Sequence, residues 1–154
     1  QKAAAQGVAQ AQNNLGLLYY NGQGVPQDDA MARQWFEKSA VQGHARAQLN
    51  LGTLYAFGRG VPQDYAAARQ WYGQAAAQGL ADAQTSLGML YEEGLGVPQD
   101  NVRAYMWYSL AAAHSTGASQ TLAADRRDEV AGRMTPAQIA EAQQLAREWT
   151  PKGK

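Results

Sequence analysis

One heptapeptide motif constrains the fold of this chain more than any other feature. The motif is Gly-x-Gly-Val-Pro-Gln-Asp, and its three copies begin at Gly22, Gly58 and Gly94, so both offsets equal 36 residues. When the chain is aligned at this period, 16 of the 36 columns hold the same residue in all three units. Such a period is typical of repeat proteins, in which similar units stack and bury their apolar sides against one another. We therefore predict a stacked array of repeats.

The period also predicts how the chain is divided. The first seven residues, QKAAAQG, are similar to QAAAQG at 74–79, which indicates the tail of a further repeat. After the third unit the sequence becomes more charged, and Thr135 and Gln138 have the spacing of a capping box at the start of a last helix. The predicted divisions are the tail of a truncated upstream repeat (1–7), three repeats (8–43, 44–79 and 80–115) and C-terminal capping helices (116–154).

Each unit is predicted to form two helices, and the first carries a recurrent glycine. In the first unit Ala11, Leu15, Leu18 and Tyr19 fall at i, i+4, i+7 and i+8, which is one side of a helix. Gly16 lies on the same helix, where glycine costs about 1 kcal/mol relative to alanine. Its return in every unit predicts that another helix packs closely against it.

The heptapeptide itself is predicted to be a turn between the two helices. Gly22 suits the left-handed conformation that ends a helix, and Pro26 forces the residue before it out of the helical region. Asp28 can then cap the second helix, because its carboxylate accepts a hydrogen bond from the free amides there. Phosphate-binding and calcium-binding loops fit less well, because a helix precedes the motif, no copy contains lysine, and each copy ends in one recurrent acid.

The second helix is predicted to turn Ala32, Trp35 and Ala40 inward, with the tryptophan filling the space that the alanines leave. The Trp and Tyr columns recur once per unit at helical spacing, so we interpret them as core residues and not as an aromatic ligand site.

Composition and isolated motifs indicate no catalytic centre. The chain has no cysteine, which excludes disulfides, thiolate metal sites and a cysteine nucleophile. His44 and His114 are 70 residues apart (114 − 44), and Glu92 and Glu93 are helix neighbours that point about 100° apart. The 13 basic and 13 acidic side chains are spread along the sequence, which argues against a nucleic-acid or membrane surface. We predict no catalytic residue, no metal, no cofactor and no membrane insertion.

The motifs together resemble the Sel-1-like repeat family, relatives of the tetratricopeptide repeat. The matching pattern is A-x-A-Q-x-x-L-G-x-L-Y, then G-x-G-V-P-Q-D, then A-x-x-W and a tail such as AAAQG, and it covers about 8–115. The later run AYMWYSLAAA and MTPAQIAEAQQLA resembles a common end of bacterial members. The resemblance implies an all-α fold, an α/α superhelix (solenoid) of antiparallel helix pairs. It also implies a non-catalytic protein- or peptide-binding scaffold or adaptor, exported or periplasmic rather than cytoplasmic.

The resemblance further implies where a partner binds. In tetratricopeptide relatives the first helix of each pair lines the concave groove, and Asn14 and Asn50 match the column whose asparagine binds a peptide backbone or terminal carboxylate. An amide suits this role because it offers both a donor and an acceptor. The columns that vary between units give the predicted partner-binding residues: Asn13, Asn14, Leu17, Tyr20, Arg46, Asn50, Thr53, Phe57, Ser86, Met89, Glu92 and Glu93.

Two other functions remain open at this stage. One alternative is a structural spacer within a larger protein, and another is self-association through the surfaces of the array. Some cysteine-rich relatives have been linked to penicillin binding and weak β-lactamase activity, which implies a weak cell-wall or β-lactam-directed enzyme as a further alternative. The absence of cysteine from this chain counts against that last alternative.

Overall fold

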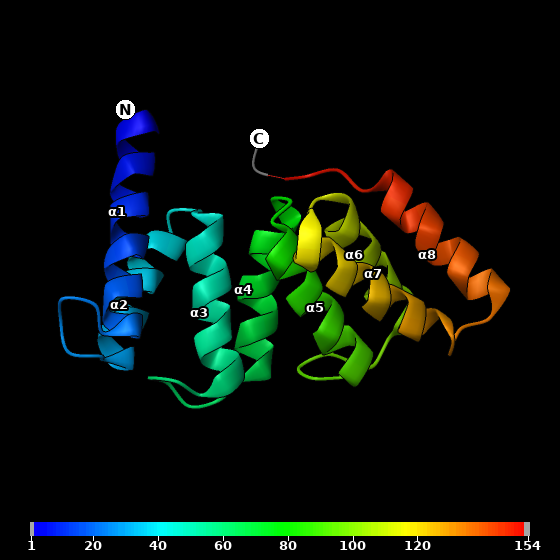
Figure 1. Ribbon diagram of the computed structural model, residues 1–154, viewed down its shortest axis with the longest axis horizontal. Coiled ribbons are helices and arrows are strands. Elements are labelled where there is room, and N and C mark those ends of the chain that lie inside the picture. Colours follow the sequence, from blue (N-terminus) through cyan, green and yellow to red (C-terminus); the bar gives the residue numbers. More distant parts are fainter. Residues whose placement is uncertain (1, 153–154) are drawn as a thin grey trace. The chain divides into compact units, whose positions relative to one another are not determined.

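The computed structural model describes residues 2–152, with side chains described from Ala5 onward (Figure 1). The described chain is all-α and contains no strand. Its helices are α1 (Lys2–Asn21), α2 (Asp29–Ala40), α3 (Ala45–Phe57), α4 (Tyr65–Ala77), α5 (Ala81–Glu93), α6 (Asn101–Ala113), α7 (Gly117–Ala131) and α8 (Pro136–Glu148). The predicted two helices per unit are therefore confirmed.

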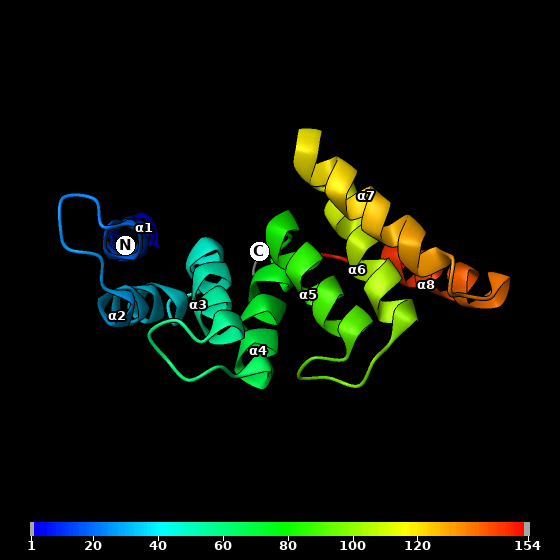
Figure 2. The same ribbon diagram turned by 60° about the horizontal axis from the view of Figure 1, so that its bottom comes forward.

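Two compact units, residues 1–71 and residues 72–154, make up the chain, and each is described by itself. In the first unit α2 packs against both α1 and α3 (Figure 2). In the second unit α6 packs against α5, α7 and α8. The buried core of the first unit consists of Ala32, Phe36, Ala40, Ala47, Leu51 and Leu54. The main buried core of the second unit consists of Ala104, Tyr105, Tyr108, Val130 and Ala142.

The heptapeptide forms a turn and a helix cap, as predicted. Gly22 has φ +66°, which is the left-handed conformation that lets a helix end. The Asp28 Oδ1 atom accepts a hydrogen bond of 3.1 Å from the backbone N–H of Met31, and so caps α2. The third copy repeats this contact, because Asp100 Oδ1 accepts from Arg103 N at 3.0 Å. The motif therefore joins two helices.

The glycine inside the first helix of each pair has the predicted packing role. A Cβ atom placed on Gly16 would lie 2.6 Å from the ring of Phe36, and one placed on Gly88 would lie 2.7 Å from the ring of Tyr108. Real Cβ atoms do not approach other atoms this closely, so only glycine leaves room for the aromatic ring. The close helix approach is therefore confirmed for the first and third pairs.

The prediction for the inward face of the second helix was wrong in one residue. Ala32 and Ala40 are buried as predicted, but the aromatic side chain between them is Phe36, which is 1% exposed, and Trp35 is only half-buried. The buried residues of α2 follow the spacing i, i+4, i+7 and i+8 from Ala32, and Trp35 lies at the edge of that stripe. The ring of Phe36 is therefore buried in the core of the helix pair, and the half-buried indole of Trp35 lies at its edge.

Helix α7 repeats one hydrogen bond of the earlier repeats. Gln48 Nε2 donates to Ala40 O at 3.2 Å, and Gln84 Nε2 donates to Ala76 O at 3.1 Å. Gln120, another 36 residues along (120 − 84), donates in the same way to Ala112 O at 3.1 Å. Helix α7 thus follows α6 as α3 follows α2, but α7 and α8 each pack against α6 and do not form a pair like α1 and α2. The predicted capping box is confirmed at the start of α8, where Thr135 and Gln138 exchange both hydrogen bonds.

Helix α1 is longer than the first helix of the following repeats. It runs unbroken from Lys2 to Asn21, so that Gly7 lies inside the helix and the described residues before repeat one form no separate helix. The apolar side of α1 is also more open than that of α3: Leu18 is 38% exposed, whereas Leu54 in the same column is fully buried.

Candidate functional site

The variable columns of the first helices divide into two sets in the structure. One set has the spacing i, i+4, i+7 and i+11, so its members follow one side of each helix. Each member is exposed or half-buried. We call this set the accessible stripe. It consists of Gln10, Asn14, Leu17 and Asn21 on α1, Arg46, Asn50, Thr53 and Phe57 on α3, and Asp82, Ser86, Met89 and Glu93 on α5.

The remaining predicted residues, Asn13, Tyr20 and Glu92, lie beside the stripe and face the neighbouring repeat. We call these three residues the inter-repeat seam. Asn13 is 1% exposed and the other two are half-buried. Asn13 and Tyr20 each form a hydrogen bond with a side chain of repeat two, and Glu92 forms one with Arg133 after α7. The seam therefore joins repeats, and direct access for a partner lies along the accessible stripe.

Asn13 orients the amide of Asn50 on the stripe. Asn50 Nδ2 donates to the buried Asn13 Oδ1 at 3.0 Å, across a separation of 37 residues. This contact holds one end of the Asn50 amide and leaves its oxygen on the half-buried side chain as an acceptor. The exposed Asn14 is held differently, because its Oδ1 accepts from Gln10 Nε2 at 2.9 Å within α1.

In the first unit an arginine of the second repeat engages the seam residue Tyr20. The Arg59 guanidinium lies 4.1 Å from the centre of the Tyr20 ring and also donates to its hydroxyl. The same guanidinium donates to both carboxylate oxygens of Asp29 at 3.1 Å, in a bidentate pair. Gly60 lets this loop approach, because a Cβ there would lie 2.6 Å from the Asp29 backbone.

In the second unit Glu92 is engaged by an arginine in a similar way. Arg133, which follows α7, donates to Glu92 Oε2 at 2.6 Å. The Tyr108 hydroxyl donates to Glu92 Oε1 at 2.7 Å. Burial, reinforced by this hydrogen bond to a carboxylate, raises the pKa of Tyr108 well above its ordinary value. Both carboxylate oxygens of Glu92 are therefore used inside the protein.

The accessible stripe of the first unit is polar and positively charged, with one exposed aromatic residue. Arg46 is the one charged side chain of α3, and α1 contains no acid. Phe57 is 69% exposed at the end of α3. Burial, and then the positive charge of Arg46, lower the pKa of the nearby His44 below its ordinary value. The surface therefore suits a ligand that brings a negative charge and an apolar group.

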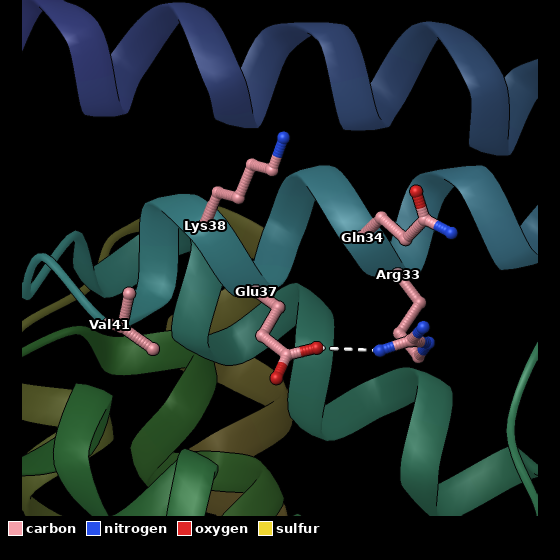
Figure 3. Close-up of a pocket in the computed structure, with 5 residues that line it drawn as sticks. All are labelled: Arg33, Gln34, Glu37, Lys38 and Val41. Carbon is pink, nitrogen blue, oxygen red and sulfur yellow. Dashed lines mark hydrogen bonds and ion pairs between the residues drawn. The ribbon is translucent and has the colours of Figure 1, made fainter.

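A separate shallow depression of about 450 Å³ lies on α2 (Figure 3). Its lining residues are Arg33, Gln34, Glu37, Lys38 and Val41. Arg33 and Glu37 form an ion pair of 2.6 Å one helical turn apart, and Lys38 Nζ lies 4.5 Å from the centre of the Trp35 ring. These contacts are typical of a solvated helix face, so we do not assign a site to this depression.

Among residues 2–152 no group of three or more histidine, cysteine or acidic side chains is arranged to hold a metal ion. Over the same residues no helix is both long enough and apolar enough to span a membrane.

The fold and the stripe together define a class: a helical-repeat protein whose variable residues lie on the first helix of each pair. The Sel1 repeat family model matches residues 9–44, 45–80 and 81–115. The chain belongs to the Sel1 repeat family, whose members generally act as protein-interaction scaffolds and are typically non-enzymatic. The matched repeats begin one residue later than the predicted units. No curated protein matches the chain.

Two solved structures are similar to this chain. One is a protective antigen present in uropathogenic Escherichia coli strains that displays an SLR fold, with 35% identity and a TM-score of 0.83. The match covers 96% of this chain and 31% of that one. The other is a Sel1 repeat protein from Oxalobacter formigenes, with 39% identity and a TM-score of 0.71, covering 77% of this chain and 45% of that one. This chain thus spans less than half of either relative. The predicted fold class is confirmed.

Sequence reasoning missed the side chains that engage the seam, namely Asp29, Arg59, Tyr108 and Arg133. A signal existed for Arg59, because it occupies the variable column of an otherwise recurrent loop, where the other copies have Gln23 and Leu95. None existed for Arg133, which lies outside the three aligned units.

Proposed function

We propose that the accessible stripe on α1 and α3 binds an extended protein segment that carries a carboxylate and an apolar side chain. The observation that supports this most is the alignment of Arg46, Asn50 and Phe57 on one side of α3, with Phe57 69% exposed. Aromatic and arginine side chains contribute most of the binding energy in many protein interfaces. The protein then acts as a non-catalytic scaffold or adaptor.

Each residue of the stripe has a definite role in this proposal. Arg46 forms a charge-assisted hydrogen bond with the carboxylate. Asn50, held by Asn13, accepts from a backbone N–H of the ligand, and Asn14 contributes a second amide. Phe57 covers the apolar side chain. The seam residues Asn13 and Tyr20 set the spacing between repeats one and two without contacting the ligand.

The corresponding stripe of the second unit has a different chemistry. On α5 it presents Ser86, Met89 and Glu93, with Asp82 in the column of Arg46. The carboxylates suit a basic ligand residue, and Met89 supplies apolar contact. We propose that this stripe binds a segment with a positive charge, with Glu93 as its exposed acid.

The test uses a library of random octapeptides with free carboxyl ends, selected on the whole chain. Enriched peptides are titrated against Arg46→Gln, Asn50→Ala and Phe57→Ala variants, with Val41→Ala and Arg147→Gln as exposed controls on other surfaces. We expect each stripe variant to weaken binding at least about tenfold, equal to 1.4 kcal/mol, and each control to change it less than about twofold. Equal affinities in stripe and control variants, or a library without any binder, would contradict the proposal.

His44 offers an independent measurement of the same contact. A carboxylate bound at Arg46 offsets part of the positive charge that lowers the pKa of His44. We expect that pKa, followed by NMR of the imidazole C–H signals, to rise when an enriched peptide is added. It should stay unchanged when the peptide carries a carboxamide in place of the carboxylate.

A further inference from the structure

The residues after α8 form an extended segment that returns across the second unit (Figure 1). Trp149 leaves the helix with extended dihedral angles, φ −70° and ψ 138°, and Pro151 keeps the residue before it extended. The backbone N–H of Lys152 donates to Ala77 O at 2.6 Å. Ala77 is the last residue of α4, where a helix leaves its carbonyls without intrahelical donors. The segment therefore supplies a main-chain hydrogen bond that the end of α4 lacks.

The ring of Trp149 fits into a cradle of three residues in the same unit. It packs edge to face on Trp107, with 6.4 Å between the ring centres, and lies 5.3 Å from the centre of the His114 ring. A Cβ on Gly79 would be 3.8 Å from the Trp149 ring. Edge-to-face packing of this kind stabilises aromatic pairs beyond the area that they bury.

A buried polar side chain forms a hydrogen bond with the histidine of the cradle. Gln84 is fully buried, and its Nε2 donates to Ala76 O at 3.1 Å. Its Oε1 lies 2.9 Å from Nδ1 of His114, which fixes the imidazole ring against Trp149. Among the aligned repeats histidine occurs in this column only at His114, where the other units have Gln42 and Gln78. The cradle thus combines a recurrent tryptophan with a histidine specific to the third repeat.

We propose that this cradle is a binding site for an extended segment anchored by a tryptophan, and that residues 149–152 occupy it as an internal ligand. An anchoring aromatic ring with a main-chain hydrogen bond three residues on is how many recognition sites hold extended peptides. The cradle shares no residue with the accessible stripe, and a partner that binds here must displace residues 149–152.

The test measures binding of the acetylated and amidated peptide REWTPK, which matches residues 147–152, by fluorescence anisotropy. The internal segment competes at an effective concentration in the millimolar range, so the unaltered chain should bind the peptide weakly. We expect the Trp149→Ala variant to bind it at least about tenfold more tightly. A second change, Trp107→Ala, should abolish that gain, and the peptide REATPK should not bind.

Circular dichroism shows whether each variant keeps its helices. Where Trp149→Ala unfolds, the indole N–H signal of Trp149 in the unaltered chain is followed by NMR instead, and millimolar peptide should shift it toward its position in free peptide. The proposal is overturned if the folded variant fails to bind REWTPK, if REATPK binds equally well, or if the Trp149 signal does not move. None of these outcomes depends on the accessible stripe, so this proposal and the proposed function can fail separately.

Discussion

The guanidinium of Arg59 stacks over the ring of Tyr20, with 4.1 Å between the guanidinium carbon and the ring centre. Tyr20 lies in the last turn of α1, and Arg59 lies in the inter-helix loop of repeat two. The same guanidinium pairs with Asp29 at the start of α2. One side chain of a variable loop column therefore connects the second repeat to both helices of the first.

We predict that Arg59→Ala lowers the free energy of unfolding by about 1 kcal/mol, since a partly exposed ion pair and a cation–π contact each contribute up to about 1 kcal/mol. Arg59→Lys should recover less than half of the loss, because lysine cannot form the bidentate pair with Asp29. Urea denaturation measures each value. Gln23→Ala is the matched control, since Gln23 is exposed in the same column of repeat one. Equal losses at both positions would contradict the role of Arg59.

The second loop glycine provides a comparison of two substitutions with the same backbone conformation. Gly24 and Gly60 have φ +77° and +74°, so alanine is strained at either position. A Cβ on Gly24 meets nothing within 4 Å, whereas one on Gly60 would lie 2.6 Å from the backbone of Asp29. We predict a cost of about 1 kcal/mol for Gly24→Ala and at least about 1 kcal/mol more for Gly60→Ala, measured by urea denaturation. Similar costs would mean that the two loops do not pack as described.

Glycines inside helices should respond in opposite directions. Gly73 lies in α4 with nothing within 4 Å of its Cβ position, so Gly73→Ala should stabilise the protein by up to about 1 kcal/mol. Gly88→Ala gains the same helix propensity, but its Cβ would meet the ring of Tyr108 at 2.7 Å. We predict a net loss of about 1 to 3 kcal/mol, measured by thermal and urea unfolding. Stabilisation by both substitutions would show that Tyr108 can move aside.

The local structure of the repeat could be predicted because its causes lie within a few residues of one another. The left-handed Gly22, the Asp28 cap and the Thr135 capping box each depend on one turn of backbone, and each is found as predicted. The close approach at Gly16 could be predicted from recurrence. Glycine destabilises a helix relative to alanine, so its return in every unit indicates that a neighbouring helix requires the space. The role given to Trp35 was wrong, because neighbouring helix residues differ by 100° and size alone does not show which is innermost.

The candidate surface could be predicted only in part. The varying columns identified the accessible stripe, but the same reasoning included Asn13, Tyr20 and Glu92, which form the seam. A column that varies between units holds residues without a packing role common to all repeats. Such a column can still hold a side chain that pairs with a neighbour present in one unit only. Such partners lie far apart in sequence, as with Glu92 and Arg133 at a separation of 41 residues. Only the folded arrangement reveals them.

Tyr108 and Glu92 give the protein a specific response to high pH. Tyr108 is fully buried and its hydroxyl donates to Glu92 Oε1 at 2.7 Å, so ionisation would place two negative charges side by side. This arrangement, after burial itself, raises the pKa of Tyr108 above its ordinary value. A group whose pKa is higher in the folded state contributes its full stabilisation below the unfolded pKa, which is about 10 for tyrosine, and loses it as the pH rises further.

We therefore predict that the free energy of unfolding falls as the pH rises above about 10, with Tyr108 as a main contributor. Tyr108→Phe should be less stable at pH 7 by about 1 to 3 kcal/mol, because Glu92 loses a hydrogen bond while partly buried, and its stability should fall less steeply above pH 10. Urea denaturation at several pH values measures both effects. The half-buried Tyr19, replaced by phenylalanine, is the control. An equally steep fall in the Tyr108→Phe variant would exclude Tyr108 as its source.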